Sequence, residues 1–247
     1  MNLFVTGANG YIGSNFIRKA SSRGYKIFAS TSKKKNKKIK NVKWLVGNID
    51  KYWKELGDTD ILVHLAAVGG YERFSRFKDC YKFNFLKSKK LLENSIKCGC
   101  NKFLIISSKK EKKIKSLKIN QKIIKDYEKK PDYIYALTKA IFSKFCLDLS
   151  RKKKLNLRII RLYHVYGRNE KKTRLWPSLI SAAKQNKNFQ MTSGNQKTDF
   201  NYIDDVIDGL IDAINFKKKK KNFLKHGIWR LVKLCRLENL LKKFGIK

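Results

Sequence analysis

The sequence contains no long hydrophobic run and no Cys-x-x-Cys pair, and each absence excludes a class of protein. No stretch of the 247 residues is both long and apolar enough to span a bilayer, so no transmembrane segment is predicted. No signal peptide precedes the first apolar run, which has the pattern of a strand, and a cytoplasmic location is therefore expected. The absence of Cys-x-x-Cys pairs predicts reduced, mostly buried thiols and no metal site at Cys80, Cys98, Cys100, Cys146 and Cys235.

Acidic residues are scarce, because 19 Asp and Glu face 59 Lys and Arg, which gives a net charge of +40. Such a balance suits a nucleic-acid partner in general. However, the lysine runs, such as residues 33–40 and 217–221, are not interleaved with aromatic side chains that stack on bases. We therefore favour a lysine-biased composition and expect no nucleic-acid partner. The positive field would still attract an anionic nucleotide substrate.

Residues 1–13, MNLFVTGANGYIG, contain a motif with a clear physical meaning. The apolar residues 2–6 predict a buried strand, and Gly7, Gly10 and Gly13 follow at regular spacing before an apolar helix. In such a strand–turn–helix unit the glycines form the tight turn, let the backbone approach a pyrophosphate and let the helix pack closely. The pyrophosphate binds free N–H groups at the start of the helix. The predicted cofactor-binding residues here are Gly7, Asn9, Gly10, Tyr11, Ile12 and Gly13.

Strands and helices are expected to alternate along the chain up to residue 162. Apolar runs predict further strands at residues 25–30, 42–46, 61–65, 103–106 and 157–162. Helical spacing predicts helices at residues 83–96 and 132–152. This order predicts an α/β fold with a doubly wound parallel sheet and right-handed crossovers. From residue 167 onward the alternation ends, as expected for a smaller substrate lobe.

The predicted catalytic motif is Tyr135-Ala-Leu-Thr-Lys139, on the helix that follows the fifth strand. Residues four apart share a helix face, so the Lys139 ammonium would lower the pKa of the Tyr135 phenol from about 10. Tyr135 would then be a usable general acid and base near neutral pH. Ser107 and Ser108 stand at the carboxyl end of the fifth strand, which is where parallel sheets bind ligands.

The glycine spacing and the Tyr-x-x-x-Lys motif together resemble the extended short-chain dehydrogenase/reductase family, which includes nucleotide-sugar epimerases, dehydratases and reductases. The resemblance covers nearly the whole chain, from residue 2 to about residue 214. It implies a Rossmann-type NAD(P)-binding domain at residues 1–166, and a partial substrate-binding lobe with a basic tail at residues 167–247. It also implies that Ser108 binds the reacting oxygen and that Lys139 holds the nicotinamide ribose. The two predicted helices, at residues 83–96 and 132–152, would form a homodimer interface.

The end of the second predicted strand bears on the choice of cofactor. In the family an acidic residue there binds the adenosine ribose of NAD, whereas this chain has Ser30, Thr31 and Ser32 followed by lysines. Hydroxyls and lysines suit a 2′-phosphate, and no carboxylate repels it. We therefore expect either NADP or NAD to bind, and favour NADP.

Further cofactor contacts follow from the resemblance. Asn48 and Ile49 stand where the family places an acidic and an aliphatic residue against the adenine. Small residues after the fourth strand let the backbone pass close to the cofactor, and here they are Leu65, Ala66 and Ala67. His64, immediately before them, is expected to be a packed core histidine and not a metal ligand.

On the substrate side, Asn84 resembles the helix asparagine that props the active-site backbone, and it is grouped with Ser108 and Lys197 as substrate-binding. Lys197 precedes Thr198, which replaces an arginine that often contacts the nucleotide diphosphate in the family. Lysine offers a point charge in its place, without the arginine fork. Asp204 and Asp205 are expected to cap and orient the following helix.

The residues after Ser108 bear on the reaction type. Sugar dehydratases of the family carry an acid pair there, whereas this chain has Lys109 and Lys110. We therefore expect hydride transfer at a carbon of a nucleotide-linked sugar, by a 4-keto-reductase or an epimerase. The alternatives are a sugar dehydratase, or a non-catalytic dinucleotide-binding protein.

The tail after residue 214 departs from the family, which continues there with a strand, a glycine turn and a helix. One interpretation is a shift of reading frame near Trp229, because another frame of a suitable back-translation encodes such a turn and helix. The other is a genuine short form that ends in a basic, amphipathic helix at a membrane surface. That helix would carry Leu231, Leu234, Leu237, Leu240 and Leu241 on one face.

Overall fold

A seven-stranded parallel sheet forms the centre of the protein. The structure is a computed structural model that describes residues 1–32, 38–70, 76–114, 116–117, 119–121, 124–125, 130–190, 197–215, 228–229 and 234–236. The strand order is β3-β2-β1-β4-β5-β6-β9, and every neighbouring pair is parallel. The strands are β1 (Asn2–Thr6), β2 (Lys26–Thr31), β3 (Val42–Val46), β4 (Ile61–His64), β5 (Lys102–Ser108), β6 (Asn156–Leu162) and β9 (Ile228–Trp229). The order reverses between β1 and β4, which confirms the predicted Rossmann-type sheet.

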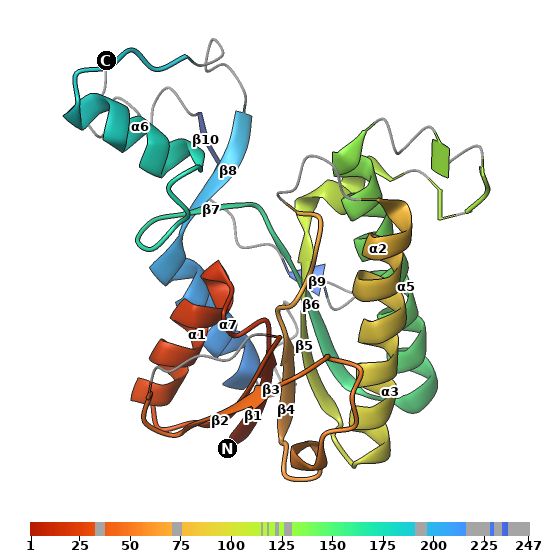
Figure 1. Ribbon diagram of the computed structural model, residues 1–247. Helices are drawn as coiled ribbons and strands as arrows, with labels where there is room; N and C mark the ends of the chain where they lie inside the picture. The colour runs from red at the N-terminus through yellow and green to blue at the C-terminus, as the bar shows by residue number, and fades with distance from the viewer. Residues whose placement is uncertain are drawn as a thin grey trace.

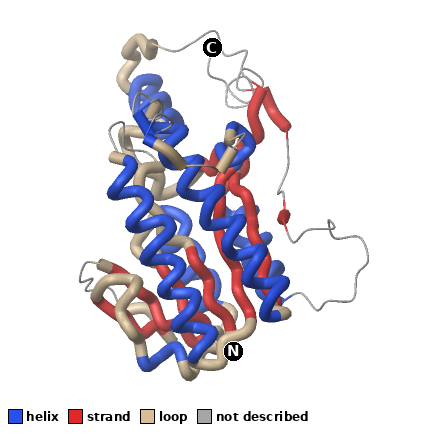
Figure 2. Tube along the Cα trace, turned by 90° about the vertical axis from the view of Figure 1, so that its right-hand side faces the viewer, coloured by secondary structure: helices blue, strands red, loops and turns tan. Residues whose placement is uncertain are grey.

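Helices cover both faces of this sheet (Figure 1). On one face lie α1 (Tyr11–Ser22) and α7 (Ile203–Asn215). On the other lie α5 (Pro131–Lys153) and a continuous helix made of α2 (Phe77–Tyr81), the π-helical η2 (Lys82–Lys87) and α3 (Ser88–Lys97). Figure 2 shows these helices running lengthwise along the strands. Two short 3-10 turns, η1 (Lys54–Leu56) and η3 (Lys109–Lys113), complete this layer.

Alternation along β1 shows how the two cores arise. Successive side chains of a strand point to opposite faces of a sheet. Leu3 and Val5 therefore pack in the core beneath α1 and α7, whereas Phe4 packs in the core beneath α3 and α5. All three side chains are fully buried, so β1 is covered on both faces.

A smaller lobe lies beyond the carboxyl ends of the strands, at the top of Figure 1. It contains a second sheet in the order β10-β8-β7, with β7 (His164–Tyr166), β8 (Lys197–Tyr202) and β10 (Leu234–Arg236), together with α6 (Leu175–Lys184). Tyr166, Trp176 and Phe200 pack with tilted and edge-to-face rings in a small aromatic cluster between α6 and this sheet. The chain therefore forms a second body above the edge where the predicted site residues lie.

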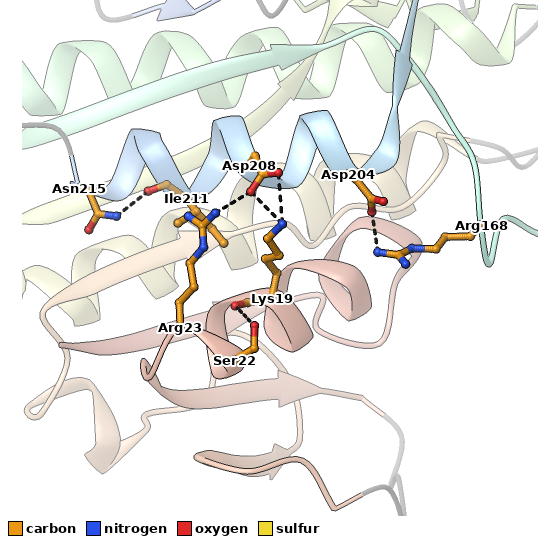
Figure 3. A network of polar contacts seen from close by, with 8 residues as sticks. All are labelled: Lys19, Ser22, Arg23, Arg168, Asp204, Asp208, Ile211 and Asn215. Atoms are coloured by element: carbon orange, nitrogen blue, oxygen red, sulfur yellow. Dashed lines mark hydrogen bonds and ion pairs between the residues drawn. The ribbon is translucent and has the colours of Figure 1, made fainter.

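Two groups of ion pairs involve α7 (Figure 3). One joins α7 to α1, and the other joins α7 to the turn after β7. The Asp208 carboxylate of α7 accepts from Lys19 at 3.1 Å and from Arg23 at 2.8 Å, both on α1. Asp204 accepts from Arg168 at 2.7 Å. Asp204 lies in the first turn of α7, where a carboxylate stabilises the positive end of a helix. This agrees with its expected role in orienting the helix, although the helix begins one residue earlier.

The six strands predicted from the sequence are confirmed, with boundaries that differ by at most two residues. The helix predicted at residues 83–96 begins six residues earlier, at Phe77, because Phe77 and Cys80 bury apolar side chains there. The predicted tail helix is wrong at Leu234–Arg236, which form β10 because the edge of β8 offers backbone hydrogen-bond partners. Leu231, Leu237, Leu240 and Leu241 lie outside the described residues.

Candidate active site

The glycine loop after β1 is built by close approach of backbone to backbone. Gly7 has a φ of +66°, and a Cβ there would lie 2.8 Å from the Ala66 nitrogen. A Cβ on Gly13 would lie 2.1 Å from the Gly7 carbonyl oxygen. Only glycine fits either position without movement of the backbone. The first turn of α1 is therefore held directly against the end of β1.

The start of α1 presents the features of an anion site. Gly10 is the N-cap and makes no side-chain capping bond, while its own N–H donates to the Gly7 carbonyl at 2.9 Å. The first N–H groups of a helix have no partner within the helix, and the helix dipole is positive there. Tyr11 and Ile12 follow in the first turn and are half-buried. A pyrophosphate fits this end of the helix.

The predicted adenosine contacts lie next to this loop. The Asn9 amide donates to the Thr31 hydroxyl at 2.5 Å, and Thr31 is buried at the end of β2. Ser32 and Asn48 are exposed, whereas Ile49 is buried. Residues 33–37, which contain the expected phosphate-binding lysines, lie outside the described residues. The described part of this region thus places hydroxyl and amide groups beside the glycine loop.

The segment after β4 connects the glycine loop to Tyr135. The Ala66 N–H donates to the Thr6 hydroxyl at 3.2 Å, and Leu65 and Ala67 flank it, half-buried and exposed respectively. At the other end of this segment a Cβ on Gly70 would lie 3.5 Å from the Tyr135 ring. The glycine loop and Tyr135 are therefore separated by one short stretch of chain.

His64 is a core residue, as expected. It is 1% exposed, and its two ring nitrogens lie 2.8 Å from the Thr6 hydroxyl and 3.0 Å from the Ser88 hydroxyl. Burial, and to a smaller extent the nearby Lys139 charge, lower the pKa of His64 to about 3. The ring is therefore neutral at physiological pH and orders the strand beneath the site.

The predicted catalytic residues Ser108, Tyr135 and Lys139 gather at the carboxyl end of β5. The Lys139 ammonium donates to the Ile106 carbonyl of β5 at 2.6 Å, which fixes α5 against this strand. The Ser108 hydroxyl accepts from the Lys110 N–H at 3.2 Å and caps η3. Tyr135 and Ser108 are half-buried, whereas Lys139 is 3% exposed. The motif predicted from its spacing on α5 therefore lies beside the carboxyl end of β5.

Burial dominates the electrostatics of Lys139. It lowers the pKa of the ammonium from 10.5 to about 8, and the Glu111 carboxylate opposes this shift. Lys139 is thus largely protonated at pH 7 but titrates within a physiological range. Its charge, one helical turn from Tyr135, favours the phenolate form of the tyrosine.

Two lysines after Ser108 place positive charge beside aromatic rings, one of which is that of Tyr135. The Lys110 ammonium lies 5.7 Å from the centre of the Tyr135 ring and donates to the Asp132 carboxylate at 2.7 Å. The Lys109 ammonium lies 5.6 Å from the Tyr163 ring, and burial lowers its pKa. These two lysines occupy the positions directly after Ser108, where a sugar dehydratase is expected to carry an acid pair.

Asn84 holds backbone near the site. Its side-chain oxygen accepts from the Val68 N–H at 2.9 Å, and its amide donates to the Val68 carbonyl at 3.0 Å and to the Thr138 hydroxyl at 3.1 Å. This agrees with the expected propping role, and direct contact with substrate stays a prediction. Lys197 begins β8, and its side chain lies outside the described residues.

Sequence reasoning missed Glu111. It lies within a lysine run, yet its side chain is 2% exposed and accepts a 2.6 Å bond from Arg161. The only local signal was that Glu111 is a single acidic residue among the lysines of Lys109–Lys113. Its partners on α5 and β6 are more than thirty positions away, so no spacing rule could identify them.

Comparison with known proteins decides the family. The model of the NAD dependent epimerase/dehydratase family matches residues 3–224. The chain belongs to this family. CDP-abequose synthase of Salmonella typhimurium strain LT2 is 24% identical over 234 residues, which cover 92% of this chain and 74% of the relative.

Solved structures of epimerases share the fold. UDP-glucose 4-epimerase of Thermotoga maritima has a TM-score of 0.76 at 20% identity, over 98% of this chain and 81% of that one. UDP-glucuronic acid 4-epimerase of Bacillus cereus, in complex with UDP-glucuronic acid and NAD, has a TM-score of 0.74 at 21% identity. That match covers 100% of this chain and 84% of the epimerase chain.

Two further findings concern membrane spans and metal ligands among the described residues of this NAD dependent epimerase/dehydratase family member. None of the described helices is long and apolar enough to cross a membrane. The same residues contain no group of three or more His, Cys, Asp or Glu side chains that could hold a metal ion. Cys80, Cys100 and Cys146 are buried and Cys98 is half-buried, and none of these four described cysteines forms a disulfide.

Proposed function

We propose that this protein is an NAD(P)-dependent oxidoreductase or epimerase that acts by hydride transfer on a nucleotide-linked sugar. The observation that carries the proposal is the meeting of Ser108, Tyr135 and Lys139 at the carboxyl end of β5. They lie one short segment away from a glycine loop shaped for a pyrophosphate. Membership of the epimerase/dehydratase family supports the substrate class.

Each residue has a distinct role in the proposed reaction. A bound nicotinamide supplies or accepts the hydride. The Tyr135 phenol transfers a proton to or from the sugar oxygen, and the Ser108 hydroxyl donates a hydrogen bond to that oxygen. Lys139 stabilises the phenolate of Tyr135 through its charge and binds the nicotinamide ribose.

The proposed cofactor site consists of the glycine loop, the end of β2 and the segment after β4. Gly7, Gly10 and Gly13 form the loop that is proposed to take the pyrophosphate. A Cβ at Gly7 or Gly13 would collide with the protein's own backbone, so this loop requires glycine at both positions. Thr31 and Ser32 offer hydroxyl groups and no carboxylate, so we favour NADP over NAD. Asn48 and Ile49 are proposed to contact the adenine.

We favour a 4-keto-reductase or an epimerase over a dehydratase. Dehydration needs an acid beside the leaving hydroxyl, whereas Lys109 and Lys110 follow Ser108 in this chain. Glu111 is the nearest carboxylate in sequence, and its oxygens accept bonds from Arg161 and two serines. Its oxygens are therefore already engaged by partners within the protein.

The proposal is tested by turnover assays with a panel of substrates. Reduction is followed by loss of NADPH or NADH absorbance with nucleotide-linked 4-keto sugars. Epimerisation is followed by chromatography of nucleotide sugars with catalytic NAD or NADP. Conversion of at least one panel member is expected. Tight dinucleotide binding with no conversion of any of them would favour a non-catalytic binding protein, and release of a 4-keto-6-deoxy product would favour a dehydratase.

We also propose a cytoplasmic homodimer, with domains divided near residue 166. The continuous helix from Phe77 to Lys97 packs beside α5, where Phe85 and Phe145 meet edge-to-face at 5.9 Å. Leu86 on this helix is 47% exposed, which suits a contact with a second copy. Light scattering after size-exclusion chromatography tests this, and a monomer at micromolar concentration would contradict it.

A further inference from the structure

Glu111 is a buried carboxylate with partners on three other elements of the fold. It accepts hydrogen bonds from Arg161 on β6 at 2.6 Å, from Ser143 on α5 at 2.7 Å, and from Ser107 on β5. Its side chain is 2% exposed, whereas that of Arg161 is 25% exposed. Burying a carboxylate is costly unless it is paired and hydrogen-bonded, and this one has both kinds of partner.

This network touches the neighbours of two of the three predicted catalytic residues, Ser108 and Lys139. Ser107 directly precedes Ser108 and lies 3.3 Å from the Ser143 hydroxyl. Ser143 is one helical turn after Lys139, on the same face of α5. The Lys139 ammonium binds the carbonyl of Ile106, the residue before Ser107. The Glu111 carboxylate therefore lies at the junction that sets the relative positions of Ser108 and Lys139.

The charges around Lys139 give Glu111 a second effect. Lys139 is deeply buried, and the groups that act on it are Glu111 on η3, Cys146 on α5 and His64 on β4. Burial raises the pKa of the Cys146 thiol and holds the pKa of His64 near 3, so both are neutral at pH 7. Among these described groups, Glu111 is the only anion. It favours the protonated form of Lys139.

We propose that Glu111 is a positioning residue of the active site, whose hydrogen bonds fix the Ser107–Ser108 strand end against α5 and whose charge acts on Lys139. This inference rests on the proposed function, because Lys139 matters only if Tyr135 transfers a proton. The competing interpretation is that Glu111 only fastens η3 to the sheet. The two differ in whether the charge of Glu111, and not merely its shape, controls the titration of Lys139.

The first experiment compares pH profiles of turnover. Glu111→Gln keeps a hydrogen-bond acceptor of the same size and removes the charge. Lys139 should then lose its proton at lower pH, and the alkaline limb of the profile should move down by about one pH unit. The matched control is Glu170→Gln, because Glu170 is also buried, with 5% side-chain exposure, and pairs with Arg174 at 3.2 Å. The control should change stability but not the position of the limb.

A double variant separates charge from packing. Glu111→Gln with Arg161→Gln replaces the ion pair by a neutral hydrogen-bonded pair and should recover part of the lost stability. The alkaline limb should stay displaced, because Lys139 still lacks its anion. The proposal would be overturned if folded Glu111→Gln kept the alkaline limb at the wild-type pH. It would also be overturned if Glu170→Gln displaced the limb equally.

The second experiment does not depend on activity. Lys139 has a folded-state pKa near 8, below its ordinary 10.5, so its contribution to stability rises with pH between these values. The difference in unfolding free energy between the protein and its Lys139→Met variant isolates this contribution. With Glu111→Gln added to both, the rise should begin below pH 8. An unchanged onset would overturn the electrostatic link even if the enzyme is active, and a shifted onset without turnover would contradict only the proposed function.

Discussion

Two loops at the same edge of the sheet are held in different ways. The loop after β1 depends on backbone approach, because Gly7 and Gly13 each leave no room for a Cβ. The loop after β5 depends on side chains, because Glu111 joins Ser107 to Arg161 on β6 and to Ser143 on α5. The first presents N–H groups to a ligand, and the second presents a hydroxyl and two cations.

We propose that the difference follows from what each loop binds. A pyrophosphate is recognised by several N–H groups at once, so its site needs the closest possible backbone and no side chains in the way. A reacting sugar oxygen needs a few polar groups at fixed positions, which side chains provide when their own rotamers are held by hydrogen bonds. We therefore expect small backbone changes to destroy the first loop, and charge changes to alter the second.

The largest effect is expected from Gly13→Ala. Its Cβ would lie 2.1 Å from the Gly7 carbonyl oxygen, so the loop and α1 must move apart. The free energy of unfolding should fall by roughly 1–3 kcal/mol, and dinucleotide affinity by more than tenfold. Chemical denaturation and fluorescence titration measure the two effects.

Gly57→Ala is the matched control for that substitution. Gly57 has a helical φ of −65°, and a Cβ there would meet its nearest atom at 3.5 Å. We expect wild-type dinucleotide affinity from this variant. If Gly13→Ala bound the dinucleotide equally well, the backbone account of the first loop would be wrong.

A smaller effect is expected from Thr31→Asp, which adds a charge beside the glycine loop. A carboxylate at this position repels a 2′-phosphate and accepts from ribose hydroxyls, so the preference for NADPH should reverse in favour of NADH. The change should be roughly 1–3 kcal/mol in relative affinity. Thr31→Asn, which is similar in size but uncharged, should not reverse it. Tighter binding of NADH by the unmodified protein would refute the assignment of NADP.

The smallest effect is expected from Asp208→Asn, which removes exposed ion pairs to the C-terminal end of α1, the helix that follows the first loop. Asp208 pairs with Lys19 and Arg23, and all three side chains are about 40% exposed. Exposed ion pairs contribute less than about 1 kcal/mol, so stability and dinucleotide affinity should change little. A loss as large as that of Glu111→Gln would show that the first loop also depends on side-chain ion pairs.

The two loops also differ in how far the sequence predicts them. Gly7, Gly10 and Gly13 lie within seven residues, and Tyr135 and Lys139 lie within one helical turn, so local spacing is enough to predict them. The Glu111–Arg161 pair spans 50 residues and exists only after β5 and β6 have paired. The bond from Lys139 to the Ile106 carbonyl is equally non-local, so spacing predicted the lysine but not its contact.

The same reason explains the outcome in the smaller lobe. β10 forms because Leu234–Arg236 find backbone partners on β8, and a pattern of leucines carries no information about that edge. The strands of the central sheet were predictable because each is itself an apolar run between polar turns. The side chain of Lys197 and most of the tail lie outside the described residues, so the predictions there stay open.

The most direct test of the account is the Tyr135→Phe variant, in one preparation assayed for dinucleotide binding and for turnover. In the proposed mechanism the phenol acts on the sugar oxygen and not on the dinucleotide, so NADPH affinity should stay close to that of the unmodified protein. Turnover of the best nucleotide-sugar substrate should fall by roughly a hundredfold or more. Wild-type turnover by this variant would contradict the proposed proton transfer by Tyr135, and with it the assignment of the loop after β5 as the catalytic one.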